Sequence, residues 1–140
     1  MLVEALHQYD TTVRRDGFET LRRGRSPKER LTAFFRNVAA NAKNTIGPRG
    51  CFLVNCALEL APRDTEVAAI VNRAFTETEA FFQSTIEEGQ RLREIPSHVH
   101  AKQTARSLLG LLLGMRVLAR SQHTPSVLDT IAEQALALVK

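Results

Sequence analysis

The sequence predicts an all-α domain, an antiparallel helical bundle of about six helices. Apolar residues recur every three or four positions, the spacing of a helix, from one end of the 140-residue chain to the other. Sustained alternation of apolar and polar residues is absent, and no Asn-Gly or Asp-Gly pair joins two alternating runs as in a β-hairpin. Proline and glycine divide the chain into segments of helical length, and we expect one domain, residues 1–140.

The first two helices differ in the strength of their signals. The first is expected over about residues 2–23, where Gly17 weakens its middle. The second has the clearest start in the chain: Ser26 as N-cap, Pro27 at the first helical position and Glu29 at the third form a capping box. The inward residues of the two helices are expected to be Val3, Leu6, Tyr9, Val13 and Leu21, then Leu31, Phe34, Phe35, Val38, Ala42 and Thr45.

A short apolar segment follows, from Gly50 to Pro62. The turn-forming residues at its two ends leave room for about three turns of helix. It contains two cysteines and one carboxamide, Asn55, which is polar on a segment that is otherwise nearly all apolar. Because a polar group in such a place needs a partner or a ligand, we expect this segment to line a binding site.

The remaining helices are longer. Asp64 is expected to cap a helix that Gly89 ends. Pro96 with Ser97 is expected to open a helix to about Arg120, and Thr124 with Pro125 a last one to about Val139. The near-heptad apolar stripe of the first of these helices is Val67, Ile70, Val71, Ala74, Thr78, Phe81, Phe82 and Thr85.

The last two helices indicate a homodimer. Between Leu108 and Ala119 every residue except Arg116 is apolar or glycine, so this helix must be covered on more than one side. Gly110 and Gly114 would allow close approach of another helix, from a second copy or from the same chain. Two copies joined through these helices would form a four-helix bundle. The expected interface residues are Leu108, Gly110, Leu111, Leu112, Gly114, Met115, Leu118, Leu128, Ile131 and Ala135.

Composition excludes several classes of protein. Two cysteines five positions apart on one helix do not pair easily, which indicates a reducing, cytoplasmic compartment. The start of the chain lacks the basic region of a signal peptide, and the uncharged run from Ser107 to Met115 is about half a membrane span. We therefore expect a soluble protein with no membrane partner.

The formal net charge of +4 is concentrated near one end. Residues 14–30 hold seven basic and three acidic side chains, and the rest of the chain is neutral overall. Such a cluster can face nucleic acid, but only Phe18 is interleaved with it for stacking on bases. A solvated helix end and loop is the alternative that we favour.

Three motifs together resemble a known family. They are Gly50 to Asn55 after a Gly-Pro-Arg turn, Ala61 to Asp64 before a long helix, and Leu111 to Arg120 near the end. In this order the chain resembles the C-terminal regulatory domain of TetR/AcrR-type bacterial transcriptional repressors. The resemblance implies an effector-binding domain that dimerises through its last two long helices. In that family an N-terminal helix-turn-helix binds DNA. It would precede the first helix expected here, so we expect that DNA-binding domain to be missing from these 140 residues.

The resemblance also implies where an effector binds. Six phenylalanines lie between Phe34 and Phe82, on the helices that enclose the family's ligand cavity. This favours a small hydrophobic or aromatic effector, although the same rings can simply fill the core. A purely structural dimerisation module, without a cavity, is a further alternative. The candidate ligand-binding residues are Phe34, Phe35, Val38, Phe52, Asn55, Cys56, Phe75, Phe82, Gln103 and Arg106.

One thiol suggests an alternative role for the domain. Cys51 lies at an expected helix N-terminus close to Arg49, where the helix dipole and the cation lower the pKa of a thiol, so it is a candidate sensor of oxidants or electrophiles. Inert packing is the competing interpretation of Cys51. Enzyme activity is not expected, since His98 and His100 are poorly spaced for a shared metal and no phosphate-binding loop occurs. We expect no cofactor and no metal.

Overall fold

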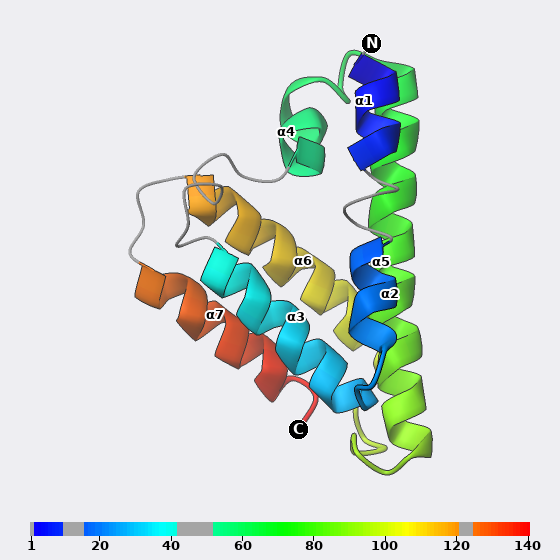
Figure 1. Ribbon diagram of the computed structural model, residues 1–140, viewed down its shortest axis with the longest axis vertical. Helices are drawn as coiled ribbons and strands as arrows, with labels where there is room; N and C mark the ends of the chain where they lie inside the picture. Colours follow the sequence, from blue (N-terminus) through cyan, green and yellow to red (C-terminus); the bar gives the residue numbers. More distant parts are fainter. Residues whose placement is uncertain (1, 10–15, 42–51, 121–124) are drawn as a thin grey trace.

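The computed structural model describes residues 2–9, 16–41, 52–120 and 125–140, and in these residues it contains helices and no strand (Figure 1). The all-α prediction is confirmed. The described helices are α1 (Leu2–Tyr9), α2 (Asp16–Arg22), α3 (Pro27–Asn41), α4 (Phe52–Glu59), α5 (Thr65–Arg91), α6 (Ala101–Arg120) and α7 (Pro125–Ala137).

Helix α5 runs along the whole molecule and contacts most other helices (Figure 1). Its 27 residues span about 40 Å at 1.5 Å per residue. The predicted N-cap is confirmed, because one Asp64 carboxylate oxygen accepts hydrogen bonds from the backbone N–H groups of Glu66 (3.0 Å) and Val67 (3.2 Å). The predicted stripe is buried along its full length: Val67, Ile70, Val71, Ala74, Thr78, Phe81, Phe82 and Thr85.

Different helices cover the two halves of α5. Helices α1 and α4 pack near its N-terminal half, whereas α3 and α6 pack against the remainder and run obliquely to it in Figure 1. Helix α7 closes the bundle by packing on both α3 and α6. Helix α2 lies along α5, where the Phe18 ring stacks on Phe81 with centroids 4.2 Å apart and planes at 8°.

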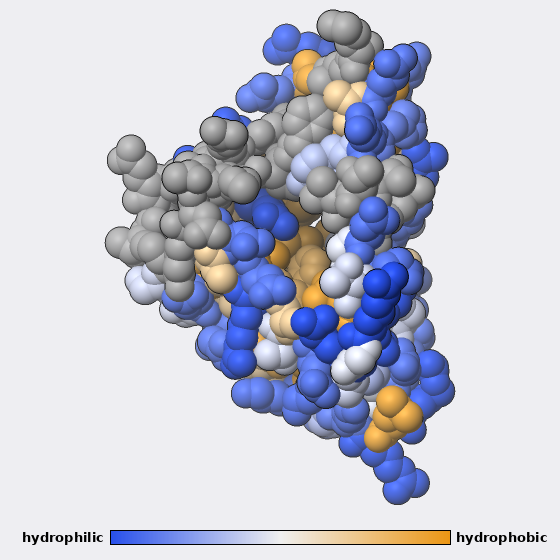
Figure 2. Space-filling model, viewed as in Figure 1, coloured by the Kyte–Doolittle hydropathy of each residue, from blue (hydrophilic) through white to orange (hydrophobic). Residues whose placement is uncertain are grey.

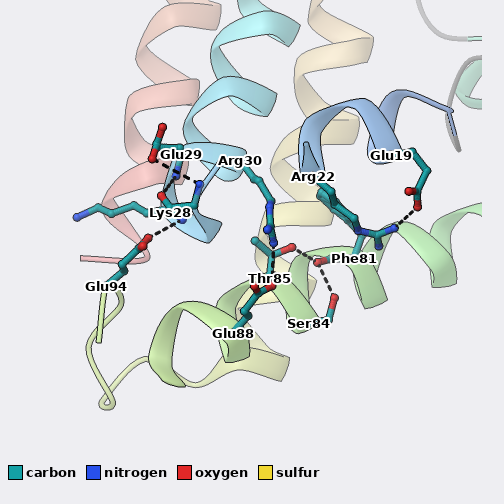
Figure 3. A network of polar contacts seen from close by, with 11 residues as sticks. Glu19, Arg22, Lys28, Glu29, Arg30, Phe81, Ser84, Thr85, Glu88 and Glu94 are labelled. Carbon is teal, nitrogen blue, oxygen red and sulfur yellow. Dashed lines mark hydrogen bonds and ion pairs between the residues drawn. The ribbon is translucent and has the colours of Figure 1, made fainter. Parts of the chain in front are cut away.

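The predicted capping box begins α3 (Figure 3). Ser26 Oγ accepts from the backbone N–H of Glu29 at 3.3 Å, and the Glu29 carboxylate accepts from the backbone N–H of Ser26 at 3.4 Å. Glu94, from the turn after α5, accepts from the backbone N–H of Lys28 at 3.1 Å. These bonds provide partners for backbone donors that the first turn of a helix leaves unpaired.

An ion pair fastens α3 to α5 close to this capping box. Arg30 Nη1 lies 2.7 Å from a Glu88 carboxylate oxygen, and the Arg30 side chain is only 14% exposed (Figure 3). Two elements distant in sequence are therefore held together at the end of the molecule opposite α1 and α4.

The predicted N-terminal helix is described in two parts. Helices α1 and α2 both fall within the predicted range of residues 2–23, and residues 10–15 between them lie outside the described residues, so the continuity of the helix stays a prediction. Gly17, expected to weaken the middle of one helix, is the second residue of α2.

The end of α5 corrects the prediction for Gly89. The helix continues to Arg91, and Gly89 is a buried residue within it. A Cβ atom at Gly89 would lie 2.6 Å from Ile95 Cδ1, and Ile95 is itself buried. Glycine leaves room here for the Ile95 side chain of the following turn. Beyond the helix end, Arg93 takes the left-handed conformation (φ 61°).

Helix α6 begins later than predicted, at Ala101 and not at Pro96. Residues 96–99 form a turn instead, with the backbone N–H of Val99 bonded to Pro96 O at 3.2 Å. The Gln90 side-chain amide donates to the carbonyl oxygens of Pro96 (3.1 Å) and Val99 (2.6 Å). Buried Val99 and these two bonds to α5 stabilise the turn against helix formation.

Candidate ligand-binding cavity

A cavity of about 370 Å³ lies between α2, α3, α5 and α6. Figure 2 shows a recess in the middle of this face, with hydrophobic residues on its floor and hydrophilic residues around it. The described residues that line the cavity are Tyr9, Gly17, Phe18, Thr20, Leu21, Arg25, Phe34, Asn37, Val38, Asn41, Phe75, Thr78, Leu109, Leu112, Leu113 and Arg116.

The walls follow from helical spacing. On α6, positions 109, 112, 113 and 116 recur every three or four residues, so one face of this helix points to the cavity. The opposite walls carry aromatic rings, Phe18 from α2, Phe34 from α3 and Phe75 from α5. Tyr9 of α1 also lines the cavity, so its described walls are mostly apolar and come from five helices.

Aromatic packing holds the Phe34 ring in place. Its centroid lies 5.2 Å from those of both Phe35 and Phe82, in edge-on arrangements of 73° and 84°. Phe35 and Phe82 are fully buried behind it. The core thus supplies a rigid backing for one wall of the cavity.

Seven of the described lining residues are polar or charged, and none of the described lining residues carries a carboxylate. The Thr78 hydroxyl donates to the carbonyl oxygen of Ala74 at 2.8 Å, and Arg25 Nη1 donates to Thr20 O at 3.4 Å. Arg116 is half-buried, and its side chain forms no hydrogen bond or ion pair with any residue of the described part of the chain.

The candidate ligand-binding residues take three kinds of position. Phe34, Val38 and Phe75 line the cavity, and Phe35 and Phe82 lie fully buried behind it. Cys56 is buried between α4 and α5, away from the lining residues. Gln103 and Arg106 are exposed on α6 and do not line the cavity.

The environment of Arg106 is a surface ion pair. Its Nε lies 3.3 Å from a Glu79 carboxylate oxygen, and its side chain is 61% exposed. The side chains of Phe52 and Asn55, and all of Cys51, lie outside the described residues. The roles predicted for those three residues therefore remain predictions.

Several lining residues were missed by the sequence prediction. Phe18 was predicted only as part of the basic segment and Leu21 only as an inward residue of the first helix, and both line the cavity. Leu109 and Leu113 also line it and were predicted in no site. A signal for Arg116 did exist: it is the single charged residue in the apolar stretch from Leu108 to Ala119. A charge in such a stretch indicates a polar partner or a ligand.

The expected dimer residues divide into an inner and an outer set. Those buried in the chain's own core are Leu108, Leu112, Met115, Leu128 and Ala135. Leu111, Leu118 and Ile131 are partly buried against that core. Gly110 and Gly114 are exposed, and nothing lies within 4 Å of a Cβ atom built on either. The two glycines therefore lie on a face of α6 that no described residue covers.

Two kinds of feature are not found among the described residues. In the described ranges no helix is long and apolar enough to cross a membrane. No group of three or more His, Cys, Asp or Glu side chains in the same ranges is placed to hold a metal ion. His98 and His100 are both exposed.

An all-α bundle with a mostly apolar cavity between its helices has space for a small molecule. A family model for the tetracyclin repressor-like C-terminal domain matches residues 27–135, from the first residue of α3 into α7. The chain belongs to this family of TetR-like C-terminal domains, which places it in transcription regulation. Comparisons with curated proteins and with solved structures find no match.

Proposed function

We propose that this chain is the effector-binding domain of a TetR-like bacterial transcriptional repressor. A small hydrophobic or aromatic effector would bind in the cavity between α2, α3, α5 and α6. The observation that carries this proposal is the cavity itself, which is lined by four aromatic side chains among the described residues and by leucines from α6. Its volume of about 370 Å³ falls within the usual range of roughly 300–1,000 Å³ for ligand pockets.

The same cavity argues against a purely structural dimerisation module. Such a module gains stability from a filled core, because empty space costs dispersion contacts. A domain that keeps a mostly apolar cavity beside well-packed phenylalanines gives up that stability. Ligand binding is a reason to retain it. The proposed role is regulatory and not catalytic.

We further propose that the domain acts as a homodimer joined through α6 and α7. The support lies on the outer side of α6, where Gly110 and Gly114 are exposed and Val117 is 44% exposed. Helices pack closely where glycines replace bulky side chains. DNA would be contacted through the N-terminal helix-turn-helix of the family, and not by these residues. A stable monomer at micromolar concentration in sedimentation equilibrium would contradict the dimer.

A thermal-shift screen tests the effector proposal. A ligand at about a hundredfold excess over its Kd adds about 2.7 kcal/mol to the free energy of unfolding, or roughly 10 °C in Tm for a domain of this size. We expect some member of a library of small aromatic and aliphatic compounds to raise Tm in this way.

A matched pair of variants locates the binding. Leu113→Trp would fill the cavity, and we expect it to abolish the shift. Lys102→Trp adds the same ring at an exposed position of the same helix and should leave the shift intact. If no compound stabilises the wild type, or if both variants respond alike, the cavity is not the effector site.

A further inference from the structure

We infer that the effector is an anion, a hydrophobic carboxylate whose head group binds Arg116. This inference rests on the proposed function, because it names the chemical class of the molecule in the same cavity. It starts from the charges of the lining residues. Arg25 and Arg116 are cations, and no aspartate or glutamate lines the cavity within the described part of the chain.

The position of Arg116 makes it the anchor. It follows Leu109, Leu112 and Leu113 on the cavity face of α6, so its charge lies beside apolar walls. The residue is half-buried without a ligand. A guanidinium in such surroundings loses hydration and gains nothing in return unless an acceptor is present.

Other arginines with partners show what Arg116 lacks. Arg30 of α3 pairs with Glu88 of α5. Arg106, which lies on α6 like Arg116, pairs with Glu79 of α5. By contrast, the Arg116 side chain has no hydrogen bond or ion pair with any described residue. Among the described residues, Arg30 and Arg106 therefore have carboxylate partners, and Arg116 has none.

The planar guanidinium selects the head group. Two parallel N–H donors of arginine match the two oxygens of a carboxylate, and a bond between charged partners is about twice as strong as a neutral one. The low polarity of the phenylalanine and leucine walls strengthens the interaction further. The remaining volume would hold the apolar body of the same molecule.

Arg25 supports this arrangement from another wall. It also lines a more open surface groove, so it lies where the cavity meets the surface. The other two cations among the described residues of this groove, Lys28 and Arg36, are matched by the carboxylates Glu29 and Glu94, so Arg25 itself is the excess positive charge there. A cation at this position attracts an anionic ligand toward the cavity. Its own bond to Thr20 O is long, at 3.4 Å, and leaves most of its donors available.

The test compares acids with their neutral isosteres. Decanoate, 4-phenylbutyrate and 2-naphthoate, each beside its primary amide, would be titrated into the full chain by calorimetry near neutral pH. We expect at least one acid to bind about tenfold or more tightly than its amide, and this preference to weaken as NaCl rises. Circular dichroism and Tm would confirm that each variant is folded.

Variants then assign the preference to one side chain. Arg116→Gln should bring the acid and its amide to nearly equal affinity, and Arg116→Lys should restore part of the preference. Arg106→Gln removes the same charge from an exposed site on the same helix and should leave the preference unchanged. If Arg116→Gln does not fold, Arg25→Gln should still reduce the preference for the acid.

The outcomes separate the two proposals. If the amides bind as tightly as the acids, or only neutral compounds of the thermal-shift screen bind, the anion inference is wrong and the effector proposal stands. If no acid, amide or screened compound binds, both are wrong. If Arg106→Gln and Arg116→Gln reduce the preference equally, the anchor is not Arg116.

Discussion

The two hydrophobic clusters of this domain differ greatly in size. The larger one joins α2, α3, α6 and α7 to the C-terminal half of α5 and includes the fully buried Phe35, Phe82 and Met115. The smaller one joins α1 and α4 to the N-terminal half of α5 and comprises Leu6, Cys56, Val67, Ile70, Val71 and Ala74. Because the free energy of burial grows with the apolar area removed from water, the larger cluster carries most of the stability.

The cavity lies where the two clusters meet. Tyr9 and Phe75 line it and pack against the smaller cluster, whereas Phe18, Val38 and Leu112 line it from the larger one. A bound ligand would therefore contact both. We expect the larger cluster to serve as a rigid scaffold and the smaller one to move when a ligand binds, since weakly held segments open at lower free-energy cost.

The largest effect is expected in the larger cluster. Phe35→Ala removes a fully buried ring and should lower the free energy of unfolding by about 3–5 kcal/mol. Urea denaturation followed by circular dichroism measures this loss. The neighbouring Phe34→Ala, at a half-buried ring that faces the cavity, should cost less and weaken ligand binding. Equal losses for the two variants would contradict the distinction between scaffold and cavity wall.

A smaller and more local effect is expected in the other cluster. Leu6 is fully buried against α5, and Leu6→Ala should cost about 2–3 kcal/mol. Amide hydrogen exchange should accelerate in α1, α4 and the first half of α5, and remain slow in α3 and α6. Uniform acceleration across all helices would mean that the two clusters unfold as one unit, and that the comparison fails.

Local rules predicted much of this fold. The Ser26 capping box, the Asp64 cap and the buried stripe of α5 all depend on residues within a turn or on one helical period. Such features are legible because the interacting groups are close in sequence. The order and type of the helices follow from them.

Tertiary contacts account for what the sequence could not predict. Gly89 carries the same local signal whether it ends a helix or admits the Ile95 side chain, and only the packing distinguishes the two. Similarly, the late start of α6 depends on the side chain of Gln90, which bonds residues six and nine positions away. The Pro96-Ser97 pair alone does not indicate that the Gln90 side chain bonds the backbone there and holds it in a turn.

The sequence predicted an apolar ligand-binding site, but it identified only some of the residues that line the cavity. Between Leu108 and Ala119 helix α6 is apolar apart from Arg116, so its sequence does not say which face meets the core, the cavity or the solvent. Leu108 and Met115 turned out to face the core, Leu109 and Leu113 the cavity, and Gly114 the outside. Arg116 alone marked a direction, because a charge on such a helix indicates one polar side.

The smallest of the three effects concerns the cap at the start of α5, beside the smaller cluster. Asp64→Ala removes the acceptor for two backbone N–H groups at 3.0 and 3.2 Å and should cost about 1 kcal/mol. We expect the loss to appear as faster exchange in the first turns of α5 and in α4, since Val67 follows directly in the stripe against which α4 packs.

The matched control is the cap of α3. Ser26→Ala removes a hydroxyl that accepts from the backbone N–H of Glu29 at 3.3 Å. Glu94 still accepts from the backbone N–H of Lys28 at 3.1 Å, and the large cluster holds the helix. Its effect should therefore be smaller and should appear in global unfolding by urea, because α3 opens only when the scaffold does. If Ser26→Ala instead accelerated exchange in α3 alone, α3 would open without the rest of the larger cluster. It would then have to be grouped with the smaller cluster, as a segment that opens before global unfolding.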